Sequence, residues 1–144
     1  MIATRQIGLV QASFALALPH VDAVAADFYA RLFVLAPETR GLFRGDMGDQ
    51  GRKLFLTLAM VVDALDVIET ILPVAEALAV RHVNYGARDH HYAIVGTALL
   101  DALAQTLGLR FDGVTREAWA AAYAILSDHM RAAAARAAPH QAAA

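Results

Sequence analysis

A histidine stands where the sequence predicts a buried side chain. In the stretch RHVNYG, residues 81–86, His82 continues a row of apolar residues spaced by four, after Val74 and Leu78. This spacing places the three side chains on one face of a helix. A buried imidazole costs free energy unless its ring nitrogens find partners. The pattern leaves two interpretations open: a core histidine bonded to a backbone carbonyl, and a ligand of a metal or cofactor.

Three further residues stand at unusual places for their type. Gln50 begins a second apolar row, which continues through Leu54 and Leu58. Tyr29 falls on the predicted inner face of an earlier helix, and Phe43 lies at the edge of a polar loop with no evident partner in the sequence. Each has a simple explanation alone: a polar first-turn residue, a hydroxyl that reaches water, and a loop anchor. Together with the histidine, they favour a site that holds a ligand.

Helices must position these residues, because helical periodicity runs along nearly the whole chain and strand-like alternation does not occur. We expect Pro73 in the first turns of one helix and Gly86 at its end. Residues 44–49, RGDMGD, predict a loop in which Asp49 could cap the next helix. The apolar rows cover residues 7–18, 25–33, 50–65, about 69–85, 92–103 and 119–130, with a short segment starting at 36–37.

These rows predict one all-α domain of six or seven helices. We place the domain at residues 1–131 and expect the alanine-rich tail, residues 132–144, to fray. The sequence shows no internal repeat and no linker.

Composition narrows the class of protein. Of 144 residues, 58% are hydrophobic and 18% charged, and the net charge is −2 with no basic stripe, which argues against a nucleic-acid partner. The absence of cysteine excludes disulfides, thiolate zinc sites and thiolate nucleophiles. The apolar run 54–62 is too short to span a bilayer, and the first residues lack the apolar core of a secretory signal. We expect a soluble cytoplasmic protein that does not bind membranes.

An ordered set of short strings, read along residues 7–130, resembles the globin family. More narrowly, it is similar to bacterial single-domain haemoglobins and to the haem domain of flavohaemoglobins. The resemblance implies a globin fold, with six to eight helices around a haem pocket. The strings are FY at 28–29, LF at 32–33, PE at 37–38, LF at 42–43, Q at 50, RKL at 52–54, RH at 81–82, HY at 91–92, IVG at 94–96, W at 119 and Y at 123.

The resemblance implies that His82 is the proximal ligand of the iron in haem b, iron protoporphyrin IX. A neutral imidazole nitrogen is a good donor to iron. The family pattern places Phe43 against the porphyrin edge, with Leu54 and Val95 on its faces. It also implies contacts near the propionate edge from Arg81, Tyr85 and Lys53.

Tyr29 and Gln50 match the distal pair of the resembled group. A phenol that donates to a dioxygen ligand of partial negative charge stabilises it by roughly 1–3 kcal/mol in a dry pocket. Gln50 could donate to the ligand as well or orient the phenol. The resemblance therefore implies tightly held, slowly released oxygen.

One proximal position departs from the family pattern. In the resembled group a Tyr and a Glu orient the proximal imidazole and strengthen its electron donation. Tyr92 matches the Tyr, but the Glu is expected about eleven residues beyond Tyr123, where this chain has Ala134. The departure implies weaker electron donation and weaker peroxidase-like or dioxygenase chemistry.

We expect a non-enzymatic haem protein that reversibly binds dioxygen, and also nitric oxide or carbon monoxide, for oxygen binding, storage or transport. The alternative is a nitric oxide dioxygenase that depends on a separate reductase, because no flavin or nicotinamide fingerprint occurs. Two other classes stay open. A haem-free helical interaction module, with a structural His82, would need an exposed apolar groove, and a gas sensor would need an output domain.

Overall fold

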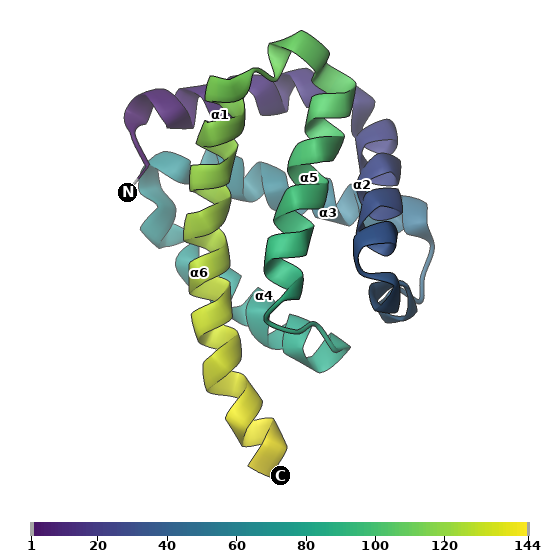
Figure 1. Ribbon diagram of the computed structural model, residues 1–144. Coiled ribbons are helices and arrows are strands. Elements are labelled where there is room, and N and C mark those ends of the chain that lie inside the picture. Colours follow the sequence, from purple (N-terminus) through teal and green to yellow (C-terminus); the bar gives the residue numbers. More distant parts are fainter. Residues whose placement is uncertain (1, 144) are drawn as a thin grey trace.

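The chain is all-α, as the sequence predicts (Figure 1). The computed structural model describes residues 2–143, with side-chain surroundings for residues 2–137. Across this range the chain forms six α-helices and four short 3-10 helices. These are α1 (Thr4–Ala17), η1 (Leu18–His20), α2 (Val21–Leu35), η2 (Pro37–Leu42), α3 (Met47–Asp63), η3 (Leu65–Thr70), α4 (Leu72–Tyr85), α5 (His91–Leu107), η4 (Gly108–Arg110) and α6 (Gly113–Ala143).

Helix α3 begins three residues before the row that predicts it. Asp46 precedes the helix with an extended backbone, and its carboxylate accepts the N–H of Asp49 over 3.0 Å. Asp46 is therefore the N-cap, and the prediction that Asp49 caps this helix is wrong. Asp49 lies inside the first turn, where its charge favours the helix N-terminus. Gln50 consequently sits in the first full turn of α3.

Helix α4 begins later than the predicted start near residue 69. Residues 65–70 form the 3-10 helix η3, and the backbone leaves helical geometry at Val67. Pro73 occupies the first turn of α4, and Gly86 ends it with φ = 102°, both as predicted. Only glycine suits this end well, since a Cβ at Gly86 would also lie 3.1 Å from Leu42 Cδ2.

The main core contains residues of α1, α2, α3, α5 and α6, and α1 packs on both α3 and α6. Phe14 of α1 stacks on Phe55 of α3 with ring centroids 5.9 Å apart, and it lies 6.3 Å from Trp119 of α6. The indole N–H of Trp119 donates to Ser13 Oγ over 2.8 Å, so this buried polar group is satisfied. The arrangement explains why Trp119 and Ser13 are both buried.

Two glycines allow helices to approach closely. A Cβ at Gly51 of α3 would lie 2.7 Å from the Ala25 Cβ of α2. A Cβ at Gly96 of α5 would lie 2.7 Å from the Tyr123 ring of α6. Both distances are below any normal carbon contact, so a larger residue would push α3 from α2 or α5 from α6.

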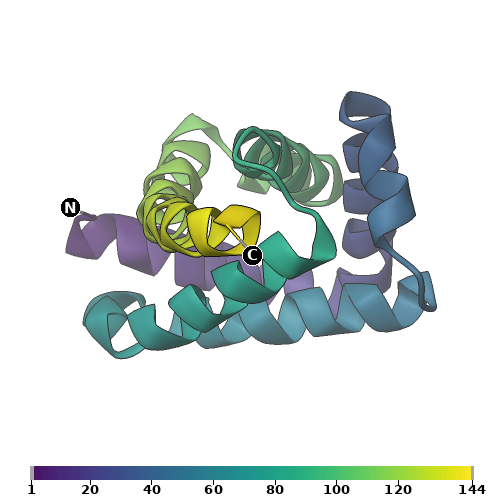
Figure 2. The ribbon, with the colours of Figure 1, turned by 90° about the horizontal axis from the view of Figure 1, so that it is seen from below.

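Helices α3 and α4 diverge from the turn η3 that joins them (Figure 2). Helix α3 packs on α2 and α1, whereas α4 packs chiefly on α6. Within the described range, the facing sides of α3 and α4 therefore do not pack extensively on one another. Because the two helices diverge, the N-terminal half of α3, which carries Gln50, and the C-terminal end of α4, which carries His82, lie on two sides of one region.

Helix α6 continues through the predicted tail to Ala143. Ala133 is buried, and Arg136 Nη2 lies 3.9 Å from Glu76 Oε1 of α4. The domain boundary after residue 131 and the fraying of the tail stay predictions, and the side chains of residues 138–144 lie outside those described.

Two stretches, Thr4–Leu35 and His91–Arg110, are long and apolar enough to cross a membrane by length and composition alone. The first bends into two helices at Pro19, and the second contains the core helix α5 (Figure 1). Core helices of globular domains pass the same test, so these stretches are weak evidence for a membrane protein.

Candidate functional site

His82 lies near the end of α4 and is half-buried. Its Nδ1 is 2.7 Å from the carbonyl oxygen of Leu78. A carbonyl only accepts, so Nδ1 carries the ring proton and Nε2 keeps its lone pair. Burial lowers the pKa of His82, the Leu78 bond opposes that shift, and the charge of Arg81 adds to it. The neutral imidazole therefore presents the nitrogen that a metal needs, and the two interpretations of His82 are compatible.

Tyr29 is the buried tyrosine of α2, with 8% of its surface exposed. Burial raises the pKa of its phenol to about 12, so it stays protonated and remains a donor at neutral pH. Within the described residues its hydroxyl makes no hydrogen bond. The Tyr29 hydroxyl is thus available to a ligand.

Phe43 packs on aromatic residues of α2. Its ring centroid lies 5.2 Å from that of Tyr29 and 5.7 Å from that of Phe33, both edge to face. The guanidinium of Arg40 lies over the Phe33 ring, 5.0 Å from its centroid. Phe43 has no evident partner in the sequence because both of its aromatic partners belong to α2, which η2 separates from it along the chain.

The two predicted distal residues are not joined to each other. Gln50 is half-buried, and its amide lies beside the loop, since a Cβ at Gly45 would be 3.8 Å from Gln50 Nε2. No hydrogen bond between Gln50 and Tyr29 occurs in the part of the chain that the structure describes. One turn along α3, Lys53 is exposed and Leu54 is half-buried against the core.

Of the remaining predicted residues, Arg81 and Tyr85 lie close to His82 on α4, whereas Val95 lies on α5. Tyr85 is 63% exposed, with its ring centroid 6.3 Å from the His82 ring, and Arg81 is exposed. Val95 of α5 is half-buried against the core. A neutral imidazole, half-buried aliphatic side chains on α3 and α5, and the divergence of α3 from α4 fit a flat apolar group ligated at His82.

Tyr92 carries a buried polar atom without a partner. Its hydroxyl has no hydrogen bond within the described residues, although the residue is only 8% exposed. It packs with Ala79 of α4 and Ala133 of α6. The Tyr123 hydroxyl donates instead to the Tyr92 backbone carbonyl over 2.5 Å. The orphaned phenol fits the departure at Ala134, because a Glu there would have been a natural partner.

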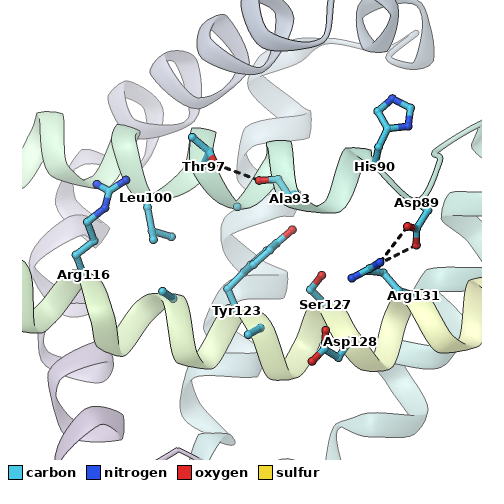
Figure 3. Close-up of a pocket in the computed structure, with 13 residues that line it drawn as sticks. Asp89, His90, Ala93, Thr97, Leu100, Arg116, Tyr123, Ser127, Asp128 and Arg131 are labelled. Atoms are coloured by element: carbon cyan, nitrogen blue, oxygen red, sulfur yellow. Dashed lines mark hydrogen bonds and ion pairs between the residues drawn. The ribbon is translucent and has the colours of Figure 1, made fainter.

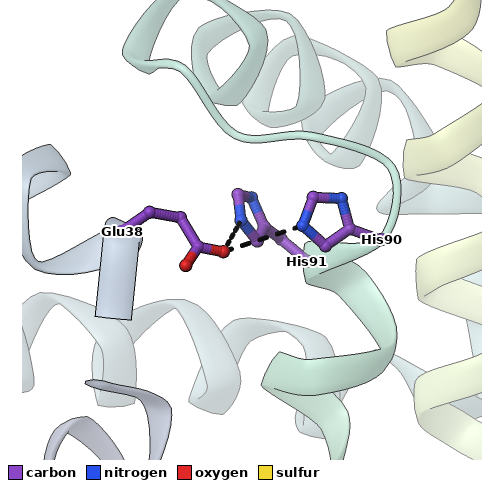
Figure 4. A group of neighbouring side chains, drawn as sticks. All are labelled: Glu38, His90 and His91. Carbon is purple, nitrogen blue, oxygen red and sulfur yellow. Dashed lines mark hydrogen bonds and ion pairs between the residues drawn. The ribbon is translucent and has the colours of Figure 1, made fainter. Parts of the chain in front are cut away.

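Apart from His82, two histidines, His90 and His91, form a cluster with Glu38 that joins η2 to the start of α5 (Figure 4). His91 is buried; its Nδ1 accepts the N–H of Arg88 over 2.9 Å, and its Nε2 lies 3.2 Å from Glu38 Oε1. His90 Nε2 lies 3.7 Å from the same oxygen. The sequence reasoning missed this link. Its two ends stand 53 residues apart, and no local pattern connects them.

A separate groove of about 420 Å³ lies between α5 and α6 (Figure 3). Arg131 closes one end with a two-pronged ion pair to Asp89, at 2.9 and 3.0 Å. Arg116 closes the other end and pairs with Asp101 over 2.7 Å. None of the predicted site residues lines this groove, so it is distinct from the His82 region.

Comparison with protein families supports one assignment. The globin family model matches residues 26–130, which include the elements from α2 to most of α6. The chain belongs to the globin family.

Characterised relatives are flavohaemoproteins that match through their globin region. The flavohaemoprotein of Bordetella parapertussis is 35% identical over 131 residues, which cover 89% of this chain and 33% of the relative. That of Chromobacterium violaceum is 31% identical over 131 residues, covering 89% of this chain and 32% of the relative. The chain thus spans about a third of the length of these relatives.

Solved structures agree with the fold. An engineered carbene transferase from Rhodothermus marinus, whose parent is designated a nitric oxide dioxygenase, superposes with a TM-score of 0.88 at 26% identity, covering 99% of both chains. A bacterial globin from Campylobacter jejuni superposes with a TM-score of 0.80 at 24% identity, covering 93% of this chain and 97% of the other.

Proposed function

We propose that this chain is a haem-containing globin that reversibly binds dioxygen, with nitric oxide and carbon monoxide as further ligands, for oxygen binding, storage or transport. The observation that carries the proposal is the His82 imidazole, whose Nδ1 is bonded to Leu78 while Nε2 keeps its lone pair. Haem b, when bound, supplies a ferrous iron to which diatomic gases bind reversibly. The globin family membership supports this reading.

The residues of the chain have separable tasks. His82 holds the iron and, through Leu78, keeps the ring in one tautomer. The neutral Tyr29 phenol donates to the gas ligand. The aromatic cluster beside Tyr29 and the half-buried aliphatic residues of α3 and α5 would exclude water from a bound haem, which would strengthen that hydrogen bond. With haem bound, Phe43 would lie against the porphyrin edge, and Leu54 and Val95 would lie on its faces. The exposed residues Arg81, Tyr85 and Lys53 would lie near the propionates.

The decisive test is haem retention. We expect His82→Ala to lose the Soret absorption of the reconstituted protein, because α4 contains no second histidine that could replace His82 as the ligand. His20→Ala is the matched control, since that histidine is exposed in η1. Equal haem retention by the His82→Ala variant and the wild type would show that His82 is not the ligand.

A second candidate function is nitric oxide dioxygenation with a separate reductase. The support is the likeness to flavohaemoproteins and to a protein designated a nitric oxide dioxygenase. In that reaction dioxygen, nitric oxide and one electron give nitrate, and a reductase or an added reductant supplies the electron. Nitrate formation with a generic reductant, measured against free haem, tests it. A rate no better than that of free haem removes this candidate.

We place the protein in the cytoplasm, because a chain without cysteine suits a reducing compartment. Fractionation of cells that express the full-length protein tests this location. Recovery with the membrane or secreted fraction contradicts it.

A further inference from the structure

The connection between α4 and α5, residues 86–90, is bonded back to His82. The Ala87 N–H donates to the His82 carbonyl over 2.9 Å, and the Gly86 N–H bonds to the carbonyls of His82 and Val83. The same residue carries the imidazole that the proposed function assigns to iron. Any shift of this connection therefore moves the backbone from which the His82 ring extends.

The far end of the connection is bonded to the His91 ring. The Arg88 N–H donates to Nδ1, so the ring proton must be on Nε2, which donates to Glu38 Oε1 (Figure 4). His91 is 5% exposed, so its ring is shielded from competing water. Glu38 is exposed, and the pKa of its carboxyl is lowered first by its own backbone N–H and then by the bond from His91. Both ring nitrogens of His91 are thereby satisfied.

The segment η2 touches the same connection at a second point. Leu42, the last residue of η2, lies against Gly86, with Leu42 Cδ2 3.1 Å from the position of a Cβ there. Glu38 is in the first turn of η2. The two ends of η2 therefore contact the two ends of the connection that follows the iron-ligand helix.

We propose that Glu38 is a positioning residue for the iron ligand: through the buried His91 ring, it holds the connection 86–90 and so sets the direction of the His82 imidazole. This inference rests on the proposed function of the His82 site. Glu38 touches neither haem nor gas in this role. It acts through the bonds that run from Glu38 to His91, from His91 to Arg88, and from Ala87 to His82.

A divalent cation is the competing use of the cluster. One donor atom each from Glu38, His90 and His91 lie within 4.8 Å of one another, a spacing that a metal could bridge. A metal would need the Nε2 lone pair of His91, but its Nδ1 accepts a backbone N–H, so the proton stays on Nε2. His82 has the reverse tautomer. The tautomers therefore assign ligation to His82 and a structural role to His91.

The test compares Glu38→Ala, Glu38→Gln and the control Asp101→Ala, which removes a partly exposed ion pair between α5 and α6. Haem transfer to apomyoglobin measures how well His82 holds iron. We expect Glu38→Ala to lose haem about 3–10 times faster, below the roughly 10–100-fold typical of groups bonded directly to a metal ligand. Glu38→Gln should match the wild type, because its amide oxygen accepts the same N–H. Asp101→Ala should match it too.

Nitrogen NMR of the imidazoles in the haem-free protein gives a readout that does not require the loaded protein. We expect the Nε2–H signal of His91 and the Nδ1–H signal of His82 to change together in Glu38→Ala and in neither other variant.

The positioning role is overturned if Glu38→Ala loses haem no faster than Asp101→Ala, or if Glu38→Gln is as impaired as Glu38→Ala. One Zn²⁺ bound per chain and lost in His91→Gln overturns the tautomer assignment. A wild type without Soret absorption overturns the proposed function instead.

Discussion

At the scale of single residues, burial decides what the two central side chains can do. Burial keeps the Tyr29 phenol protonated and the His82 imidazole neutral. The first is then a donor without a protein partner among the described residues, and the second is a lone-pair donor with its other nitrogen already bonded. Each side chain is thus in the protonation state that its predicted role requires, the phenol as a donor and the imidazole as a lone-pair donor.

Tyr29→Phe tests the donor. Removing the hydroxyl deletes a hydrogen bond worth roughly 1–3 kcal/mol, so oxygen release should become about tenfold faster or more. Stopped-flow displacement of oxygen measures the rate. Phe33→Leu, which changes a neighbouring ring but removes no donor, should alter the rate much less. Equal release rates for Tyr29→Phe and the wild type would mean that the phenol points away from the ligand.

Ala134→Glu tests the departure on the proximal side. Ala134 is half-buried on α6, next to Ala133, which packs in one cluster with Tyr92. A carboxylate here should accept from Tyr92 and increase the negative charge near the His82 ring, so the reduction potential of the haem should fall. Spectroelectrochemistry measures it. Ala134→Gln supplies an acceptor without charge, and an equal shift in both variants would exclude the charge as the cause.

At the scale of elements, close helix crossings hold the site. Gly96 allows α5, which carries Val95, to lie directly on the Tyr123 ring of α6. Gly51 does the same for α3 and α2, which carry the predicted distal residues. The two crossings therefore fix the spacing of the helices that surround the His82 region.

Gly96→Ala should destabilise the fold by about 1–3 kcal/mol, because the new Cβ would lie 2.7 Å from the Tyr123 ring. Urea unfolding followed by circular dichroism measures this change. Gly8→Ala in α1 is the matched control: nothing lies within 4 Å of its new Cβ, so it should be neutral or stabilising by up to about 1 kcal/mol. A Gly96→Ala variant as stable as Gly8→Ala would show that α5 and α6 adjust at no cost.

At the scale of the whole molecule, three bonded carboxylates confer sensitivity to acid: Asp89 and Glu38 join distant segments, and Asp112 accepts an N–H at the start of α6. The pKa of Asp89 is lowered chiefly by its bond to Arg131, that of Asp112 by the Thr115 backbone N–H, and that of Glu38 by its own backbone and by His91. A depressed folded pKa means that the unfolded chain binds protons more readily. The stability from these groups is present above their ordinary values of 4.5 for Glu and 3.8 for Asp, and it is lost as pH falls through the lower folded values.

Urea midpoints at about pH 5 and about pH 3 test this linkage. We expect the wild type to lose stability between the two values, and Asp89→Asn to lose less, since its amide no longer titrates. Asp63→Asn, at an exposed position, should follow the wild type. An identical decline in Asp89→Asn and the wild type would show that the Arg131 pair does not contribute.

The sequence predicted the all-α class, the place of His82 on its helix and the glycine that ends that helix, because each depends on spacing within one helix. It misjudged the cap of α3 and the start of α4, where neighbouring acidic residues and a 3-10 turn compete for the same boundary. The roles of Tyr29, Gln50 and the haem contacts stay predictions.

The sequence did not predict the contacts between distant segments. The Phe43 cluster, the Trp119 bond to Ser13 and the Glu38 bond to His91 each join elements whose approach no local pattern encodes. Periodicity reports which residues share one face of a helix, and the sequence alone determined that much, although Val74 of the predicted buried His82 row is 44% exposed. Which side chain meets which across two helices depends on their packing, and only the tertiary structure decided it.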